Sequence, residues 1–231
     1  MNGQLNINDS GVDKEMIEIT TVVIVLALLV TGYWWRYRSL ACPANLSWLV
    51  ENPYMNAVAG PDTLLARLHL EERMRVLDVG CGPGRLSLPA AKLVGNNGEV
   101  VALDIQSKML AKLSVRIENM GIENIRLINA GAGSGATDQA YFDRALLVTV
   151  LGEIPDKPAA LLEIYNALKV GGILSITEVL PDPHYTSLKK VRALCRDAGF
   201  EEAEYFDGKI AFTINFIKPV SSAEADSDTK Q

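Results

Sequence analysis

The sequence has few cysteines and no dense run of basic residues, and each shortage excludes a class of protein. The three cysteines, Cys42, Cys81 and Cys195, are an odd number at wide spacing, which fits neither a disulfide framework nor a zinc site. We therefore expect reduced thiols and no metal site. The net charge is −6, whereas a nucleic-acid-binding surface needs clustered Lys and Arg. Nucleic acid is not an expected partner.

What is present is an ordinary globular composition. Hydrophobic residues make up 48% and charged residues 22% of the 231 residues, enough for one sizeable α/β domain with additional segments but hardly for two domains. No internal repeat is visible.

An uncharged apolar segment covers residues 19–35, closes on three aromatic residues and is followed by Arg36 and Arg38. We expect a transmembrane helix, although roughly 25 Å at ~1.5 Å per residue is a little short of the hydrocarbon core. The alternatives are a buried core helix and a cleaved signal peptide, but the preceding stretch is acidic where a signal peptide is basic. The arginines predict a single-pass protein with its main domain in the cytosol.

From residue 75 onward, short apolar strands alternate with helical stretches, a pattern that predicts a parallel sheet covered on both faces. Near the end, Asp207 and Gly208 separate two strand-like runs, which indicates an antiparallel hairpin. The expected strands are 76–79, 100–104, 125–128, 142–150 and 173–178, and the expected helices are 86–93, 108–120 and 159–168. We divide the chain into a polar tail (1–18), a transmembrane helix (19–35), juxtamembrane and capping helices (36–70), the α/β domain (71–220) and a disordered tail (221–231).

The central motif is a strand that leads through glycines into a helix, Asp78-Val79-Gly80-Cys81-Gly82-Pro83-Gly84-Arg85. Glycines let the backbone bend sharply and approach a ligand. A dinucleotide-binding Gly-x-Gly-x-x-Gly would place its third glycine at Arg85, so the spacing disfavours NAD. Twenty residues beyond Gly84, Asp104 ends the second strand, where a carboxylate accepts hydrogen bonds from ribose hydroxyls. Together these features predict a nucleoside ligand.

These residues resemble the class I S-adenosylmethionine-dependent methyltransferases, particularly the small-molecule subgroup that includes quinone and phospholipid methyltransferases. The resemblance covers roughly residues 43–219: residues 78–84 match the family's first motif, 101–104 its ribose-binding strand, and 161–178 its helix, glycine turn and fifth strand. It implies a Rossmann-like, doubly wound α/β fold with a mostly parallel seven-stranded sheet and a reversed last strand. The implied cofactor is S-adenosyl-L-methionine.

By that resemblance, Asp78 lies near the cofactor's ammonium group, Asp104 holds the ribose and Ile105 flanks the adenine. A turn or helix-capping carboxylate is the alternative for Asp78. The family usually places an acidic residue after the third strand, but here Gly131 occupies that position. Asn129 or the backbone at Ala132 could replace the acid, with Asp138 and Asp143 as remote substitutes. The expected cofactor-binding residues are Asp78, Gly80, Cys81, Gly82, Gly84, Asp104, Ile105, Asn129, Gly131 and Ala132.

The methyl acceptor is harder to predict, because methyl transfer can proceed by positioning alone. His184 and Glu153, on the expected loops after two strands, are the candidate catalytic residues for an acceptor that loses a proton. Tyr54 and Tyr185 are candidates for the acceptor pocket. A membrane tether favours a lipid, quinone or other hydrophobic acceptor, and a soluble small molecule is the alternative. The competing functions are a membrane-anchored cofactor-binding module without turnover and an NAD-dependent reductase.

Overall fold

The computed structural model describes residues 9–38 and 53–220. Cys42, the apolar stretch at 46–50 and the predicted tail at 221–231 lie outside the described residues. The chain divides into two compact units, residues 1–40 and residues 41–231, and each is described by itself.

The first unit holds one long helix, α1 (Asp9–Arg38). Its large apolar side chains between Met16 and Val30 are 48% to 66% exposed. Among the residues described, no helix combines the length and the apolar character needed to cross a membrane. The predicted helix over 19–35 is present, but the structure does not support the prediction that it crosses a membrane. Helix α1 is 30 residues long, but its uncharged apolar stretch covers only residues 19–35, which at ~1.5 Å per residue falls short of a hydrocarbon core about 30 Å thick.

The second unit is built on one seven-stranded sheet with the order β3-β2-β1-β4-β5-β7-β6. Strands β1 to β5 are parallel to their neighbours in this group, and β7 runs antiparallel to both β5 and β6. The predicted mostly parallel sheet with a reversed C-terminal hairpin is confirmed. The strands are β1 (Arg75–Val79), β2 (Glu99–Asp104), β3 (Ile125–Asn129), β4 (Phe142–Val148), β5 (Leu168–Val179), β6 (Glu201–Phe206) and β7 (Ala211–Ile217).

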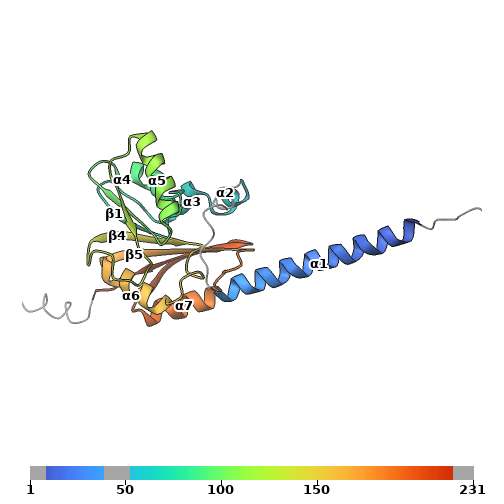
Figure 1. Ribbon diagram of the computed structural model, residues 1–231. Coiled ribbons are helices and arrows are strands. Elements are labelled where there is room, and N and C mark those ends of the chain that lie inside the picture. Colours follow the sequence, from blue (N-terminus) through green and yellow to red (C-terminus); the bar gives the residue numbers. More distant parts are fainter. Residues whose placement is uncertain (1–8, 39–52, 221–231) are drawn as a thin grey trace, which may run out of the picture. The chain divides into compact units, whose positions relative to one another are not determined.

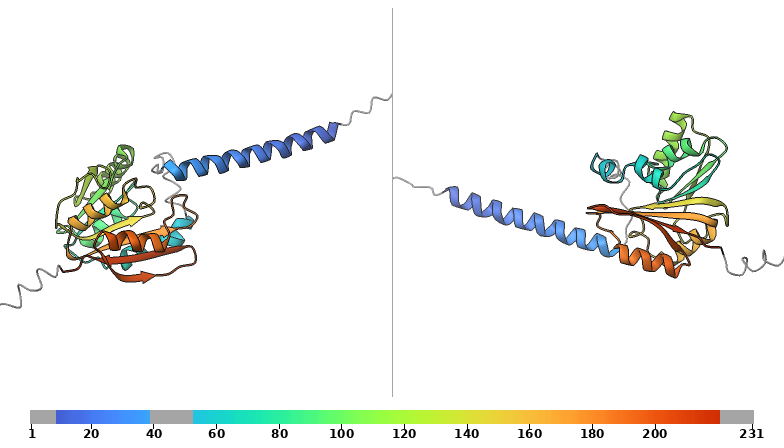
Figure 2. Two further views of the ribbon diagram at one scale, coloured as in Figure 1. Left: turned by 90° about the horizontal axis from the view of Figure 1, so that it is seen from below. Right: turned by 180° about the vertical axis from the view of Figure 1, so that it is seen from behind.

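Helices cover both faces of this sheet (Figures 1 and 2). On one face lie α3 (Pro61–Arg67), α4 (Ser87–Val94) and α5 (Ser107–Met120), and on the other lie α6 (Lys157–Ala167) and α7 (Leu188–Asp197). Side chains alternate along each strand: Val76 and Val100 pack with α3 and α4, whereas Leu77 and Val101 pack with α6 and α7. Both faces of the central strands are thus buried.

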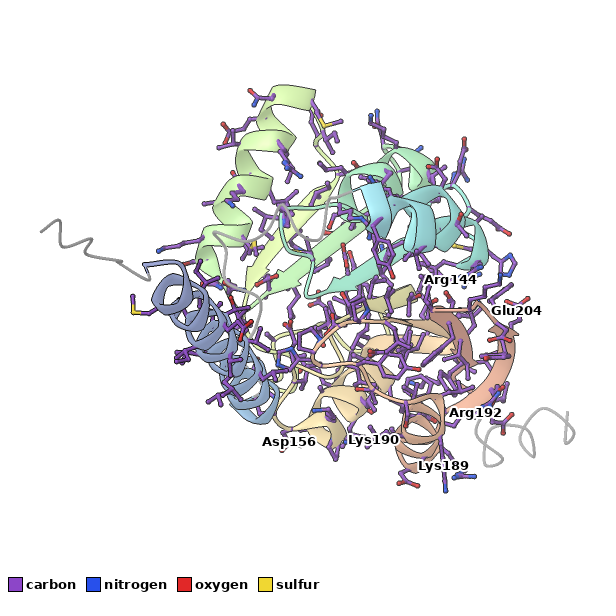
Figure 3. The ribbon with its side chains drawn as sticks, turned by 90° about the vertical axis from the view of Figure 1, so that its right-hand side faces the viewer. Arg144, Asp156, Lys189, Lys190, Arg192 and Glu204 are labelled. Atoms are coloured by element: carbon purple, nitrogen blue, oxygen red, sulfur yellow. The ribbon has the colours of Figure 1, made fainter. Side chains whose placement is uncertain are left out.

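Local chemistry explains several element ends. Gly121 ends α5 in the left-handed conformation at φ 61°, a conformation that favours glycine. The Asp156 carboxylate accepts the Ala159 N–H at 3.0 Å and caps α6 (Figure 3). The sequence prediction missed α7, whose Val191 and Cys195 are buried while Lys189 and Lys190 face outward (Figure 3).

The sheet order creates a switch point between β1 and β4. Strand β1 leads to β2 and β3 on one side, whereas β4 and β5 lie on the other. In open α/β sheets, ligands bind outside the carboxyl ends of the strands at such a point. The loops after β1, β2, β4 and β5 are therefore the place to look for a site.

Candidate functional site

The glycine loop after β1 folds back against the end of β2. The N–H groups of Gly80 and Cys81 donate to the Leu103 carbonyl at 2.7 and 3.1 Å. Gly80, Gly82 and Gly84 all have positive φ, at 71°, 53° and 88°, a region that favours glycine. A Cβ atom on Gly80 would collide with Val150, whereas one on Gly82 would meet open space. The loop is packed tightly at Gly80 and leaves room for a ligand at Gly82.

Asp104 joins the loops after β1 and β2. Its Oδ2 accepts the Gly82 N–H at 2.9 Å and its Oδ1 accepts the Gln106 N–H at 2.7 Å. The side chain is buried, and this burial raises the pKa of Asp104 despite the two backbone hydrogen bonds. A carboxylate has about four lone-pair sites. Each oxygen therefore retains acceptor capacity for a pair of hydroxyl groups.

Asp78 is buried near the end of β1, and its side chain contacts the first residue of α4. Its Oδ2 accepts the Ser87 hydroxyl at 2.5 Å. Burial raises the pKa of Asp78 to about 6, the Ser87 hydrogen bond opposes that rise, and the charge of Asp104 adds to it. This hydrogen bond ties Asp78 to the beginning of α4 through a side chain, and both the capping role and contact with a cofactor ammonium stay predictions.

The expected adenine side lies at the ends of β2 and β3. Ile105 is 65% exposed, and a Cβ on Gly131 would lie 3.5 Å from Ile105 Cδ1, an ordinary contact. Asn129 Nδ2 donates to the carbonyls of Asp104 and Ile105 at 2.9 and 3.1 Å. The Asn129 amide therefore holds the backbone of the ribose strand, and Gly131 leaves space beside Ile105. Ala132 packs partly against the core.

The two remote substitutes for the missing acid lie elsewhere. Asp138 forms an ion pair with Arg126 at 2.6 Å, and Asp143 forms one with Lys169 at 2.6 Å. Asp143 also accepts the N–H of Arg75, the first residue of β1, at 2.8 Å. It therefore lies at the amino ends of the strands, opposite the glycine loop.

The loop after Gly131 is held by a residue that the sequence prediction missed. Glu163 of α6 accepts the N–H of Gly133 at 2.5 Å, and its other oxygen accepts both the N–H and the hydroxyl of Thr137 at 3.0 Å. A single acid in an ordinary helix carries no sequence signal for this role.

The structure brings together the two predicted catalytic residues. Glu153 follows β4 and His184 follows β5, yet His184 Nδ1 lies 3.8 Å from Glu153 Oε1. Their side chains are 5% exposed for His184 and 18% for Glu153. A Cβ on Gly152 would collide with the His184 carbonyl oxygen, so the two loops pack backbone to backbone. Their catalytic role stays a prediction.

Other ionisable groups surround this pair. Asp182 Oδ1 accepts the His184 N–H at 2.6 Å, and Glu178 Oε2 accepts the Thr186 N–H at 3.0 Å. Lys157 Nζ, at the beginning of α6, donates to the carbonyls of Gly152 and Ile154 at 3.2 and 2.6 Å. Asp182 and Lys157 were missed, because neither spacing nor periodicity marks them.

A short helix, α2 (Pro53–Ala59), connects the two sides of the site. The Tyr54 hydroxyl donates to the Leu180 carbonyl at 2.9 Å, at the beginning of the loop that carries His184. The Arg85 guanidinium, next to the glycine loop, donates to the Ala59 carbonyl and to Asn56 Oδ1. Tyr54 thus lies beside the expected acceptor loop. Tyr185 instead packs edge-on against Phe212, with ring centroids 6.1 Å apart.

The fold and the site together define the class of protein. A glycine loop after β1, a buried carboxylate at the end of β2 and the reversed β7 belong to the class I S-adenosylmethionine-dependent methyltransferases, as the sequence resemblance implied. The residues fit this cofactor, because Gly82 leaves open space where a side chain would intrude and Asp104 retains acceptor sites for a ribose.

Comparison with known proteins identifies the family. The family described as "Methyltransferase domain" matches residues 70–213, and the chain belongs to it. S-adenosyl-L-methionine is the methyl donor of this class of enzymes.

Three relatives illustrate the range of similarity. The chain is 33% identical over 122 residues to the ubiquinone/menaquinone biosynthesis C-methyltransferase UbiE of Edwardsiella ictaluri. The matched stretch covers 52% of this chain and 48% of that protein. It therefore spans about half the length of the curated relatives it matches. Two solved structures share the fold. A SAM-dependent methyltransferase from Aquifex aeolicus has a TM-score of 0.71 and 22% identity, and the match covers 77% of this chain and 99% of that chain. The [4+2]-cyclase SpnF has a TM-score of 0.64 and 20% identity, and the match covers 70% of this chain and 80% of that chain.

Proposed function

We propose that this protein transfers a methyl group from S-adenosylmethionine to a small-molecule acceptor. The observation that carries the proposal is the junction of Asp104 with the glycine loop, where one carboxylate holds Gly82 and Gln106 and keeps capacity for a diol. Family membership over residues 70–213 supports it.

When bound, S-adenosylmethionine supplies an electrophilic methyl group on a sulfonium. In this chain, Asp104 would hold the ribose, the glycine loop the methionine part, and Ile105 one face of the adenine. Charge disperses during such a displacement, so positioning and exclusion of water can supply much of the rate. Glu153 and His184 would accept a proton from acceptors that carry one.

For the acceptor, we propose a hydrophobic small molecule or lipid-like compound. The relatives at 33% to 35% identity have names that state methylation of carbon in ubiquinone and menaquinone biosynthesis. Because the chain spans only about half of their length, this supports the chemical class of acceptor and not one compound.

We further propose that α1 associates the enzyme with a membrane and leaves the methyltransferase unit in the cytosol. The exposed apolar side chains from Met16 to Val30 support this, as do Arg36 and Arg38. The hydroxyls of Thr21 and Thr31 donate to carbonyls one turn earlier at 2.7 Å. This bonding satisfies both hydroxyls within the helix, as an apolar surrounding requires.

The catalytic proposal is tested in two stages on the full chain. Calorimetric titration with S-adenosylhomocysteine and with NADH measures the ligand class, and binding of NADH alone would indicate a reductase. Transfer of labelled methyl from S-adenosylmethionine into a lipid and small-molecule extract then measures turnover. Tight S-adenosylhomocysteine binding without label transfer would instead support a binding module, a reading that fits the absence of an acid at Gly131.

The membrane proposal is tested by flotation with anionic lipid vesicles. The matched control is the same chain without residues 1–40, one of the two compact units. We expect the full chain to float and the shorter chain to stay at the bottom. Equal behaviour of both would overturn the proposal, and in cells, digestion of the methyltransferase unit by external protease would reverse its orientation.

A further inference from the structure

A group of buried and partly buried ionisable side chains gathers where the loops after β4 and β5 meet the beginning of α6. Glu153 comes from the first loop, Asp182 and His184 from the second, Lys157 from α6 and Glu178 from the end of β5. We call these five residues the acceptor-side cluster. Its position next to the glycine loop follows from Val150, whose side chain fills the space against Gly80.

Glu178 is the most enclosed member of this cluster. Its side chain is 1% exposed, and its Oε2 accepts the N–H of Thr186, two residues beyond His184. Within the described part of the chain, Glu178 Oε1 has no hydrogen-bond partner. Leaving a buried polar atom unpartnered costs about 1–3 kcal/mol. Holding the Thr186 N–H requires only one of the two carboxyl oxygens, so the second oxygen has no structural task among the described residues.

Resting on the proposed methyltransferase function, we propose that Glu153 and His184 take up the proton of a protic acceptor. Glu178 is the positioning residue that ionises as they do so, which keeps the buried charge balanced. The acceptor class is then one with a hydroxyl, a primary or secondary amine, or an acidic carbon.

The proton and electron balance of this step is simple. The acceptor atom loses its proton to the His184 imidazole or the Glu153 carboxylate, and its electron pair forms the bond to the methyl carbon. The pair of the broken sulfur–carbon bond stays on sulfur. A positive charge gained at His184 favours the ionised form of Glu178, whose proton then leaves to solvent.

The groups that face Glu178 agree with such coupling. Burial raises the pKa of Glu178 to about 8, and the charges of Asp182 and Glu153 raise it further, whereas the Thr186 N–H and the Lys157 ammonium oppose the rise. Burial raises the pKa of Tyr185, and the charge of Glu178 adds to that rise. Glu178 is therefore neutral near pH 7, and a positive charge gained within the cluster would favour its ionised form.

The test uses the two histidines of the chain, His69 and His184. We would follow their imidazole nitrogen signals by NMR in the full chain from about pH 5 to pH 10. In the wild type, the His184 signals should show an inflection near pH 8 that reports Glu178. In Glu178→Gln, which keeps an oxygen for the Thr186 N–H, that inflection should vanish. His69, which pairs with Glu204 at 2.9 Å, serves as the internal reference.

Glu202→Gln is the matched control, because it removes an exposed carboxylate whose partner Arg192 lies on α7. We expect it to retain the His184 inflection near pH 8. Persistence of the inflection in Glu178→Gln, or its absence in the wild type, would overturn the coupling whatever the fate of the catalytic proposal.

Turnover gives the second measurement. We expect Glu178→Gln to bind S-adenosylhomocysteine as the wild type does, with KM for the acceptor extract unchanged, but to lower kcat roughly tenfold and lose the ionisation near pH 8. An unchanged pH profile of kcat would overturn the proton-uptake role. Failure of every variant and the wild type to bind S-adenosylhomocysteine would instead refute the proposed function, and the histidine titration would still decide the coupling.

Discussion

The cofactor half and the acceptor half of the site use different chemical groups. In the cofactor half, the contacts are backbone N–H groups of the glycine loop, and one side chain, Asp104, links residues 82 and 106. In the acceptor half, five ionisable side chains come together from four parts of the chain; Glu178 and His184 are buried and the other three are partly buried. The first half tolerates few residue types because its backbone conformation demands glycine, whereas the second depends on charges that balance one another.

The largest effect is expected from a substitution of Asp104 in the cofactor half. We expect Asp104→Ala to weaken S-adenosylhomocysteine binding at least about 100-fold, since hydrogen bonds to a charged group are worth about 1.5–3 kcal/mol each and two are lost. Calorimetric titration measures the effect. Asp138→Asn, which removes an exposed ion-pair partner of Arg126, should bind as the wild type does. Unchanged affinity in a folded Asp104→Ala protein would refute the assigned site geometry.

A substitution at Gly152 should damage the acceptor half and spare the cofactor half. A Cβ there collides with the His184 carbonyl, whereas the same change at Gly82 meets open space but a strained φ of 53°. We expect Gly152→Ala to lower methyl transfer tenfold or more and to reduce Tm by several degrees, with S-adenosylhomocysteine affinity unchanged. Gly82→Ala should do the reverse, losing affinity with a smaller change in Tm. Similar losses of affinity in both variants would show that the halves are not separable.

The contrast between backbone and side-chain groups also explains which residues of each half the sequence could predict. The glycine loop and Asp104 could be predicted, because positive φ restricts residue type and a strand ending in Asp places the carboxylate at the site. Glu153 and His184 could be placed only on loops, and their approach to 3.8 Å depends on the sheet order. Glu163 and Lys157 could not be predicted, because a charged residue on an exposed helix looks the same whether or not a loop folds onto it.

The same holds for the fold. The five parallel strands were predictable as short apolar runs, but α7 was missed because only Val191 and Cys195 are fully buried on it. The hairpin was predicted, yet β6 and β7 are joined by residues 207–210 rather than by Asp207 and Gly208 alone. Over residues 19–35, the apolar pattern predicted a helix correctly, whereas no helix in the described part of the chain is both long and apolar enough to cross a membrane.

The stability of the protein should depend on pH over a different range for a buried acid of the cofactor half than for one of the acceptor half. Both Asp78 and Glu178 have raised pKa values in the folded chain, about 6 and about 8. The stability each contributes is fully present below its unfolded pKa, 3.8 or 4.5, and is lost as the pH rises through the folded value. Relative to the wild type, Asp78→Asn should gain Tm between about pH 4 and pH 7, and Glu178→Gln between about pH 5 and pH 9, by several degrees each. Thermal unfolding measures this, and parallel Tm curves for variant and wild type would contradict the buried, protonated state.

The smallest effect is expected at Gly131, where the cofactor half departs from its relatives. A carboxylate at this position would meet the adenine amino group, and the added Cβ lies at ordinary contact distance, 3.5 Å, from Ile105. We expect Gly131→Asp to leave S-adenosylhomocysteine affinity unchanged or to tighten it up to about tenfold, because one hydrogen bond to a charged group is worth at most about 1.5–3 kcal/mol before ordering costs. Gly131→Asn is the matched variant without the charge and should gain less. If affinity falls sharply while Tm is unchanged, the loop after β3 is assigned wrongly, and Asn129, whose amide now holds the Asp104 and Ile105 carbonyls, becomes the residue to test on the adenine side.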